Sequence, residues 1–118
     1  MNDDRPRIEA RTVTAGTIVV RVAGDICGQG GIRFRRTLVG ELTGRPQVLI
    51  LDLTQITRID TGGINTLCLA AELTAEEDIG LCLVAPAQGA ARAGLEAAKS
   101  TDTFEIFSSV TEALRLCS

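Results

Sequence analysis

The hydrophobic positions near the start of the chain follow two patterns in succession. Residues 8–13 alternate weakly between apolar and polar side chains, as in a half-exposed strand, and residues 12–16 supply turn residues. Residues 17–23 (TIVVRVA) are dense in β-branched side chains, which predicts a more deeply buried strand. The two strands together predict an antiparallel hairpin.

Further along, the apolar runs become continuous. Residues 47–54 (QVLILDLT) and 79–85 (IGLCLVA) are almost uninterrupted, which is typical of strands that are covered on both faces. Residues 104–107 (FEIF) predict one more short strand.

Segments with a helical period separate these strands. Apolar residues recur at intervals of three and four in residues 32–42 and 62–77, and an Ala-rich segment covers residues 87–99. The sequence Ser109-Val-Thr-Glu112 is a capping box that opens a further helix. The stretch GDICGQGG after the second strand predicts a flexible loop, because its glycine spacing fits neither a dinucleotide fingerprint nor a Walker loop.

The order β-β-α-β-α-β-α-β-α predicts an α/β fold. Right-handed crossovers would build a mixed, mostly parallel sheet of roughly four to five strands, with an antiparallel N-terminal edge hairpin and about four helices. At 118 residues the chain is expected to form one domain over residues 1–118, with residues 1–6 as a flexible lead.

The composition argues against several classes of function. A net charge of −3 and a pI near 4.9 argue against direct binding of nucleic acid, which requires a basic face. The absence of histidine removes His-based general base catalysis and most zinc-enzyme sites. The chain is therefore a poor candidate for the commonest kinds of catalytic and metal site.

The four cysteines, Cys27, Cys68, Cys82 and Cys117, form no CxxC pair. Because the last three lie among apolar neighbours, we expect small buried hydrophobic side chains rather than metal ligands or disulfides. The N-terminal sequence MNDDRPR is polar, and no apolar run reaches the length of a membrane span. These features predict a cytoplasmic protein with no membrane partner.

The stretch ITRIDTGGINTL, residues 56–67, combines an acid, a hydroxyl group and two glycines where a helix should begin. The simplest interpretation is an N-cap, with Thr61 as first choice and Asp60 as second. Two glycines in a first turn each destabilise the helix by about 1 kcal/mol relative to alanine, so a cap alone does not explain them. An open backbone is favoured there for another reason.

Asp60-Thr61-Gly62 is also the tripeptide with which an aspartic protease presents its catalytic carboxylate. That hypothesis requires an all-β homodimer in which two aspartates share one proton. The helical pattern that follows the tripeptide argues against it.

The stretch VLILDLTQITRIDTGGINTL resembles the signature of STAS domains, specifically the small bacterial anti-sigma factor antagonists. That signature is a buried strand ending in an Asp, a short connection, and Asp-Ser-(Ser or Thr)-Gly-Leu opening a helix. The GDI after the second strand is similar to the family's Gly-Glu-Leu-Asp, and the element order agrees over nearly the whole chain.

The resemblance implies a partner-switching regulator that is not an enzyme and needs no cofactor and no metal. In that family the residue after the Asp is phosphorylated by a partner that is both an anti-sigma factor and an ATP-dependent serine kinase. The unphosphorylated antagonist occupies this kinase and frees the sigma factor. Thr61 matches the phosphoacceptor, and Gly62 and Cys27 stand where the family usually has a Ser or Thr and an acid.

The resemblance also implies the partners and the docking face. The partner is an anti-sigma factor with serine/threonine kinase activity, a phosphatase would reset Thr61, and the chain would be a monomer or a weak dimer. The alternative is a STAS scaffold or constitutive binder that is no longer phosphorylated. The predicted partner-binding residues are Asp25, Cys27, Asp60, Thr61, Gly62, Gly63 and Ile64.

Overall fold

The computed structural model describes residues 6–117. The predicted flexible lead therefore lies outside the described residues, apart from Pro6. Within the described range no helix is long and apolar enough to cross a membrane.

The described residues form five β-strands, four α-helices and one short 3-10 helix. In chain order the elements are β1 (Arg7–Thr14), β2 (Thr17–Ile26), α1 (Gln29–Leu42), β3 (Val48–Ile59), α2 (Thr61–Glu76), β4 (Gly80–Val84), α3 (Ala90–Ala97), the 3-10 helix (Thr101–Thr103), β5 (Glu105–Phe107) and α4 (Val110–Cys117).

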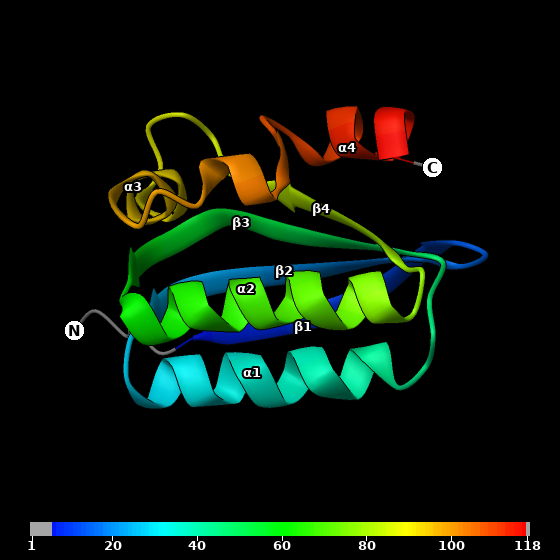
Figure 1. The fold of residues 1–118 in the computed structure, drawn as a ribbon, viewed down its shortest axis with the longest axis horizontal. Helices are drawn as coiled ribbons and strands as arrows, with labels where there is room; N and C mark the ends of the chain where they lie inside the picture. The colour runs from blue at the N-terminus through cyan, green and yellow to red at the C-terminus, as the bar shows by residue number, and fades with distance from the viewer. Residues whose placement is uncertain (1–5, 118) are drawn as a thin grey trace.

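The strands form a single sheet in the order β1-β2-β3-β4-β5. The β1–β2 pair is antiparallel and the other three pairs are parallel, as the sequence predicts. Helices α1 and α2 lie side by side on one face of the sheet, and α4 lies on the opposite face (Figure 1). The predicted α/β architecture is thereby confirmed.

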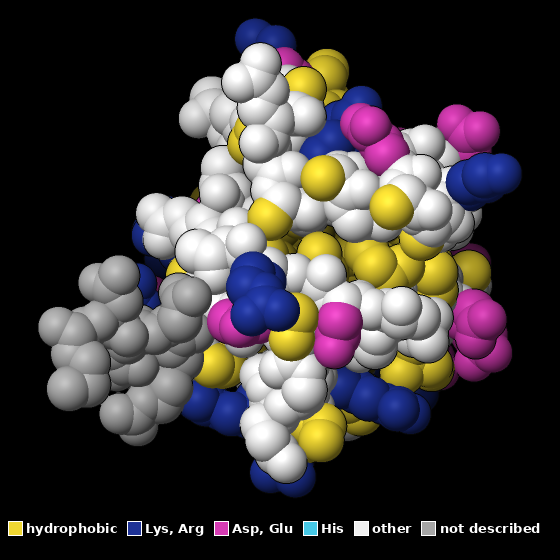
Figure 2. All heavy atoms as spheres, turned by 90° about the vertical axis from the view of Figure 1, so that its left-hand side faces the viewer, with side chains coloured by type: hydrophobic (Ala, Val, Ile, Leu, Met, Phe, Trp, Pro, Cys, Tyr) yellow, Lys and Arg dark blue, Asp and Glu magenta, His cyan; other side chains and the backbone are white. Residues whose placement is uncertain are grey.

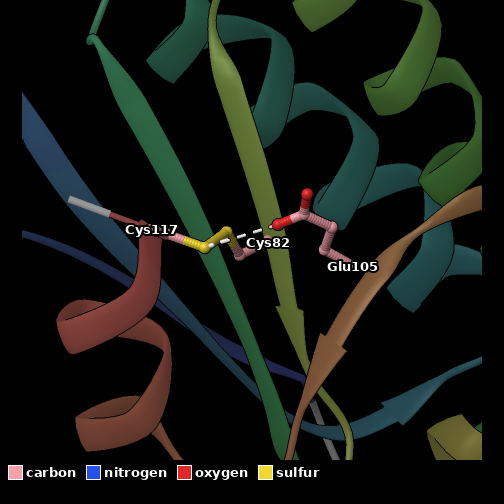
Figure 3. Close-up of side chains that lie close together, drawn as sticks. All are labelled: Cys82, Glu105 and Cys117. Atoms are coloured by element: carbon pink, nitrogen blue, oxygen red, sulfur yellow. Dashed lines mark hydrogen bonds between the residues drawn. A yellow bond between two sulfur atoms is a disulfide. The ribbon is translucent and has the colours of Figure 1, made fainter.

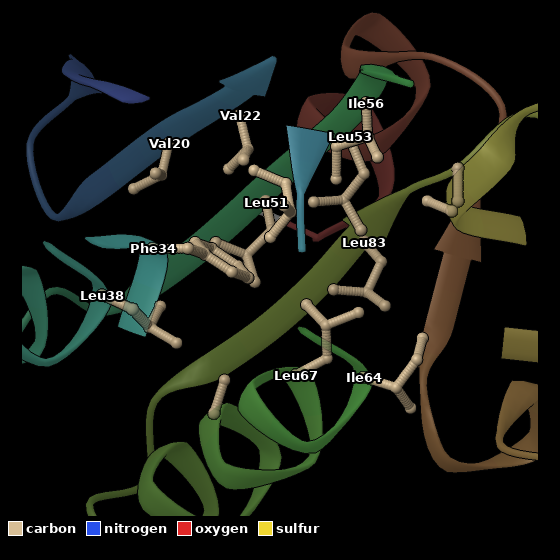
Figure 4. Packing of buried hydrophobic residues seen from close by; sticks show 14 of the residues in the cluster. Val20, Val22, Phe34, Leu38, Leu51, Leu53, Ile56, Ile64, Leu67 and Leu83 are labelled. Carbon is tan, nitrogen blue, oxygen red and sulfur yellow. The ribbon is translucent and has the colours of Figure 1, made fainter. Parts of the chain in front are cut away.

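The main core lies between the sheet and helices α1, α2 and α3. Strand residues such as Val20, Leu51 and Leu83 meet Phe34 of α1 and Leu67 of α2 there (Figure 4), all fully buried. A smaller cluster occupies the other face under α4 and consists of Val19, Ile50, Cys82, Val84 and Ala113. Both faces of β3 and β4 are thus covered, which explains their continuous apolar sequences.

Strands β2 and β3 run further than predicted, and this corrects the loop assignment. Parallel pairing continues to Ile26 on β2 and Ile59 on β3, with register shifts on the way. The GDI segment is therefore strand, and α1 begins at Gln29 rather than at residue 32. Only a glycine at position 30 allows this early start, since a Cβ there would lie 2.3 Å from the carbonyl oxygen of Asp25.

The helix predicted over residues 87–99 is shorter in the structure. Residues after Pro86 form a turn, closed by the Gly89 N–H, which donates to the Pro86 carbonyl oxygen at 2.9 Å. Helix α3 starts only at Ala90. The capping box holds in part, because the Glu112 N–H donates to the Ser109 hydroxyl oxygen at 3.1 Å.

The prediction for the cysteines is wrong in two respects. Cys82 and Cys117 form a disulfide, and only Cys82 is buried. Cys27 and Cys68 are free and half-buried. The sequence gives no sign of the disulfide, because Cys82 and Cys117 are 35 residues apart and only the packing of α4 across β4 brings them together.

Two neighbouring residues of α1 test the position of the main core. Leu38 is fully buried, whereas Val39 is 40% exposed. We expect Leu38→Ala to lower the free energy of unfolding by about 3 kcal/mol, because it removes buried surface and leaves a cavity. Val39→Ala should change it by less than about 0.5 kcal/mol. Urea denaturation followed by circular dichroism measures both, and equal losses would contradict this packing.

Candidate functional site

Two loops meet at the carboxyl ends of β2 and β3. Parallel strands place their carboxyl ends at one edge of the sheet, and Ile26 pairs with Ile59 at this edge. Cys27 and Gly28 lead from β2 into α1, and Asp60 leads from β3 into α2. The fold therefore brings together the two segments in which the sequence places candidate residues.

The carboxylate of Asp60 fastens the two loops together. Its Oδ1 accepts the Gly63 N–H at 2.9 Å, and its Oδ2 accepts the Gly28 N–H at 3.2 Å. Asp60 has extended dihedral angles, so it is the N-cap of α2 and Thr61 is the first helical residue. The preference for Thr61 as the cap is wrong, because the cap must reach the N–H three positions on, and the Asp60 side chain does so.

These hydrogen bonds set the charge of Asp60. The N–H of Gly63 and then that of Gly28 stabilise the carboxylate, which lowers the pKa of Asp60 below its ordinary value of 3.8. Asp60 is therefore ionised at neutral pH, close to the exposed side chain of Thr61.

The second acid of the site is Asp25, at the end of β2. Its Oδ1 accepts the Cys27 N–H at 2.9 Å. The Cys27 thiol and N–H lower the pKa of Asp25, with a smaller contribution from Arg58. Desolvation and then the neighbouring Asp25 raise the pKa of the Cys27 thiol, so Cys27 stays protonated at neutral pH and is a poor nucleophile.

Arg58 is a residue that the sequence analysis missed. Its guanidinium Nη1 lies 3.5 Å from Oδ2 of Asp25, and the two residues are register partners on β3 and β2. The side chain of Arg58 is 70% exposed, so this ion pair contributes little to stability. No local signal could have revealed it, because the pairing depends on the strand register.

Thr61 presents its side chain to solvent in the first turn of α2. Within residues 6–117 its hydroxyl group has no hydrogen-bond partner. The cap occupies the N–H of Gly63, while the N–H groups of Thr61 and Gly62 have no partner inside the helix. An anion on Thr61 would therefore lie next to free donors and the positive end of the helix dipole.

The two glycines after Thr61 serve different purposes. A Cβ at Gly63 would lie 2.6 Å from Cγ1 of Ile59, so Gly63 lets α2 start against the end of β3. A Cβ at Gly62 would meet only the Asp60 carboxylate, at 3.3 Å. A Cβ at Gly94 of α3 would lie 2.7 Å from Cγ2 of Ile59, so this glycine packs α3 against the same side chain.

A groove of about 470 Å³ runs beside Thr61, between the start of α2 and α3. Figure 2 shows this end of the molecule, where hydrophobic side chains gather in a patch bordered by acidic and basic ones. Ile64 lines the groove but is only 6% exposed, and Gly63 is buried. The lining residues that the sequence analysis missed include Ile59, Asn65, Cys68, Gly94 and Ala97.

Within residues 6–117, the side chains around Thr61 form no group suited to a metal ion. Among the described residues, the group that could hold one is Cys82, Glu105 and Cys117, elsewhere in the fold.

The sequence matches the profile of the STAS domain over residues 8–113. The chain belongs to the STAS domain family. No curated protein matches the sequence.

Solved structures share this STAS fold. An anti-sigma factor antagonist from Mycobacterium paratuberculosis superposes with a TM-score of 0.88 at 21% identity, covering 98% of this chain and 97% of that one. The anti-sigma factor antagonist SpoIIAA in its unphosphorylated form has a TM-score of 0.75 at 14% identity, covering 92% and 93%. A variant of RsbS from Moorella thermoacetica has a TM-score of 0.76 at 17% identity, covering 92% of each chain.

The two glycines of the STAS site form a matched pair for mutation. Gly63→Ala should lower the free energy of unfolding by about 1–3 kcal/mol, because its methyl group collides with Ile59. Gly62→Ala should change stability by no more than about 1 kcal/mol, since alanine favours the helix while its methyl group would lie 3.3 Å from Oδ1 of the anchored Asp60. Urea titrations measure both. A smaller loss for Gly63→Ala in an Ile59→Ala background would identify the collision, whereas equal losses in both backgrounds would contradict it.

The Asp60 clamp predicts a specific pH dependence. Because the folded-state pKa of Asp60 is lowered, its stabilising effect is complete above 3.8 and is lost as the pH falls through the lowered value. The amide NMR signals of Gly28 and Gly63 should therefore shift together, with one midpoint below 3.8. Gly40, which lies in the open on α1, supplies a control amide. Separate midpoints, or a midpoint above 3.8, would contradict the clamp.

Proposed function

We propose that this STAS domain is an anti-sigma factor antagonist that works by partner switching. In its unmodified state it binds an anti-sigma factor with serine/threonine kinase activity and so releases a sigma factor. Phosphorylation of Thr61 ends this binding, and a phosphatase restores it. The observation that carries the proposal is the exposed hydroxyl of Thr61, without a partner among residues 6–117, on the first turn of α2 directly after the anchored Asp60.

The fold can carry a phosphate at this position. Phosphorylation adds about −1.5 to −2 charges and three strong acceptor oxygens at pH 7. Thr61 lies where a helix N-terminus favours an anion, next to the N–H groups of Thr61 and Gly62. The phosphorylated domain should therefore stay folded, and phosphorylation should change only its affinity for the partner.

A docked partner would respond differently. The face around Thr61 already carries the ionised Asp60 and Asp25 beside an apolar groove. A phosphate buried against a partner that fits the neutral hydroxyl would have to be desolvated next to these charges. If this costs roughly 3 kcal/mol, the affinity falls about a hundredfold.

The solved neighbours support the same mode of action. The Bacillus cell fate determinant SpoIIAA has been solved in a phosphorylated form, with a TM-score of 0.71 to this chain, as well as in an unphosphorylated form. A STAS fold of this kind thus exists in both states. By analogy the protein acts as a binder in the cytoplasm, as a monomer or weak dimer, without catalytic groups or a cofactor of its own.

The residues of the proposed docking face contribute in two ways. Asp60, Thr61 and Gly62 are exposed and can contact the partner directly. Gly63 and Ile64 are buried, and they would act by placing Thr61 and by forming a wall of the groove. Asp25 and Cys27 form the adjacent edge, held to Asp60 through Gly28.

Of the two alternative functions, one is left to experiment and the other is contradicted by the structure. A STAS scaffold that binds constitutively, without phosphorylation, uses the same face and is separated by the experiment below. The homodimeric aspartic protease is contradicted by the structure, since Asp60 caps a 16-residue helix in an α/β fold.

Three variants of Thr61 test the switch. Purified protein is incubated with candidate anti-sigma factor kinases and Mg-ATP, and the modified residue is mapped by mass spectrometry. We expect phosphate on Thr61 in the natural protein and in Thr61→Ser, and none in Thr61→Ala. Thr61→Ala should bind the kinase about as tightly as the natural protein, while Thr61→Glu should bind about a hundredfold more weakly.

Thr111 supplies the matched control, because it is also exposed but lies on α4. Thr111→Ala and Thr111→Glu should leave both phosphorylation and binding unchanged. Binding that is equal for Thr61→Ala and Thr61→Glu, with no phosphate on Thr61, would favour the constitutive binder. Phosphate on another residue would contradict the assignment of Thr61.

A further inference from the structure

Cys82, Glu105 and Cys117 come together on the sheet face that carries α4, away from Thr61. Cys82 of β4 and Cys117 in the last turn of α4 form a disulfide (Figure 3). Glu105 is the register partner of Cys82 on β5, and its Oε2 lies 3.9 Å from the sulfur of Cys117. Three elements thus meet at this disulfide.

The disulfide adds a covalent link to a short helix that packs onto the sheet through Ala113 and the partly buried Val110 and Leu114. Helix α4 has eight residues and one fully buried side chain, Ala113. So short a helix is not stable alone in water, so its order depends on packing onto the sheet. The residues it covers, Val19, Ile50 and Val84, are apolar and would face solvent without it.

The two cysteines differ in exposure. Cys82 is 2% exposed, whereas Cys117 is half-buried. An open hollow of about 470 Å³ reaches both, with Phe104, Glu105 and Leu116 among its lining residues. A small thiol can therefore approach the disulfide, and it meets the Cys117 sulfur first. When this sulfur becomes a thiol, the carboxylate of Glu105 is in place to accept its hydrogen bond.

We propose that Cys82 and Cys117 form a reversible thiol–disulfide site, with low-molecular-weight thiols and disulfides as co-reactants, that fastens and releases α4. In reduction, the thiolate of a small thiol attacks the Cys117 sulfur and forms a mixed disulfide, and Cys82 leaves as a thiolate that takes up a proton. A second small thiol attacks the mixed disulfide and releases the Cys117 thiol with one small disulfide. Two electrons pass to the protein, and oxidation by the small disulfide is the reverse.

This site is independent of the proposed function. The disulfide joins β4 to α4, on the sheet face opposite α2, whereas Thr61 starts α2 at the carboxyl end of β3 (Figures 1 and 3). The Asp60 clamp shares no residue with it. Release of α4 is therefore expected to leave the amides of Gly28 and Gly63 as they are.

The test compares the full chain in glutathione disulfide and in dithiothreitol, both with a chelator present. Reduction should lower the Tm by about 10 °C, because the disulfide closes a loop of 35 residues. Hydrogen exchange in α4 should speed up by about tenfold or more, and both thiols should become reactive to iodoacetamide. The amide signals of Gly28 and Gly63 should not move.

Cysteine variants separate this site from the free thiols. Cys117→Ser should have the lower Tm in both buffers and no response to dithiothreitol, while Cys68→Ser should respond like the natural protein. Glu105→Gln should shift the glutathione ratio at which half of the protein is oxidised, since it removes the charge beside Cys117.

Three results would overturn the proposal. The first is that both thiols stay free in glutathione disulfide. The second is that α4 keeps its exchange protection after reduction. The third is that, without chelator, the chain holds one Zn²⁺ through both sulfur atoms and remains unoxidised. The interpretation of each result does not depend on whether Thr61 is phosphorylated.

Discussion

The parallel pairing of β2 with β3, maintained as far as Ile26 and Ile59, is the constraint on which the candidate site depends. It ends both strands at one edge of the sheet, so the two following loops begin side by side. Only then can the carboxylate of Asp60 take one N–H from each loop, at Gly28 and at Gly63. Had the strands ended where their apolar runs end, the connections to α1 and α2 would be longer, and a single side chain could not join them. The rigid presentation of Thr61 follows from this pairing.

Ile59 has a comparable role in packing. It is the last residue of β3, and a Cβ on Gly63 or on Gly94 would collide with it, so two helices approach this one side chain through glycines. The need for an open backbone after Thr61, inferred from the sequence, thus has two sources. Gly63 is required by the packing inside the molecule, where a Cβ would collide with Ile59. Gly62 is exposed, and a Cβ there would meet only the Asp60 carboxylate, so this glycine leaves the surface next to Thr61 bare.

The sheet separates two kinds of chemistry. At the carboxyl edge of β2 and β3, ionised Asp60 directly precedes the exposed Thr61, and ionised Asp25 lies at the end of the neighbouring strand, an arrangement that suits regulation by an added charge. On the face under α4, a disulfide lies over a small apolar cluster, an arrangement that suits regulation through the order of α4. A phosphate at the first position and a thiol exchange at the second would each act locally. The two proposed sites would let the domain respond to two separate inputs.

The sequence by itself determined the element order, the mixed sheet, the start of α2 near Asp60 and the choice of Thr61 as candidate. The elements and the start of α2 follow from periodicity and capping, which act between residues a few positions apart, and the choice of Thr61 follows from the resemblance of residues 48–67 to the STAS signature. Only the tertiary structure decided that Asp60 rather than Thr61 is the cap and that the GDI segment is strand. It also decided the ion pair of Asp25 with Arg58 and the disulfide of Cys82 with Cys117. These depend on strand register and helix packing, which bring distant residues together and which no local pattern encodes.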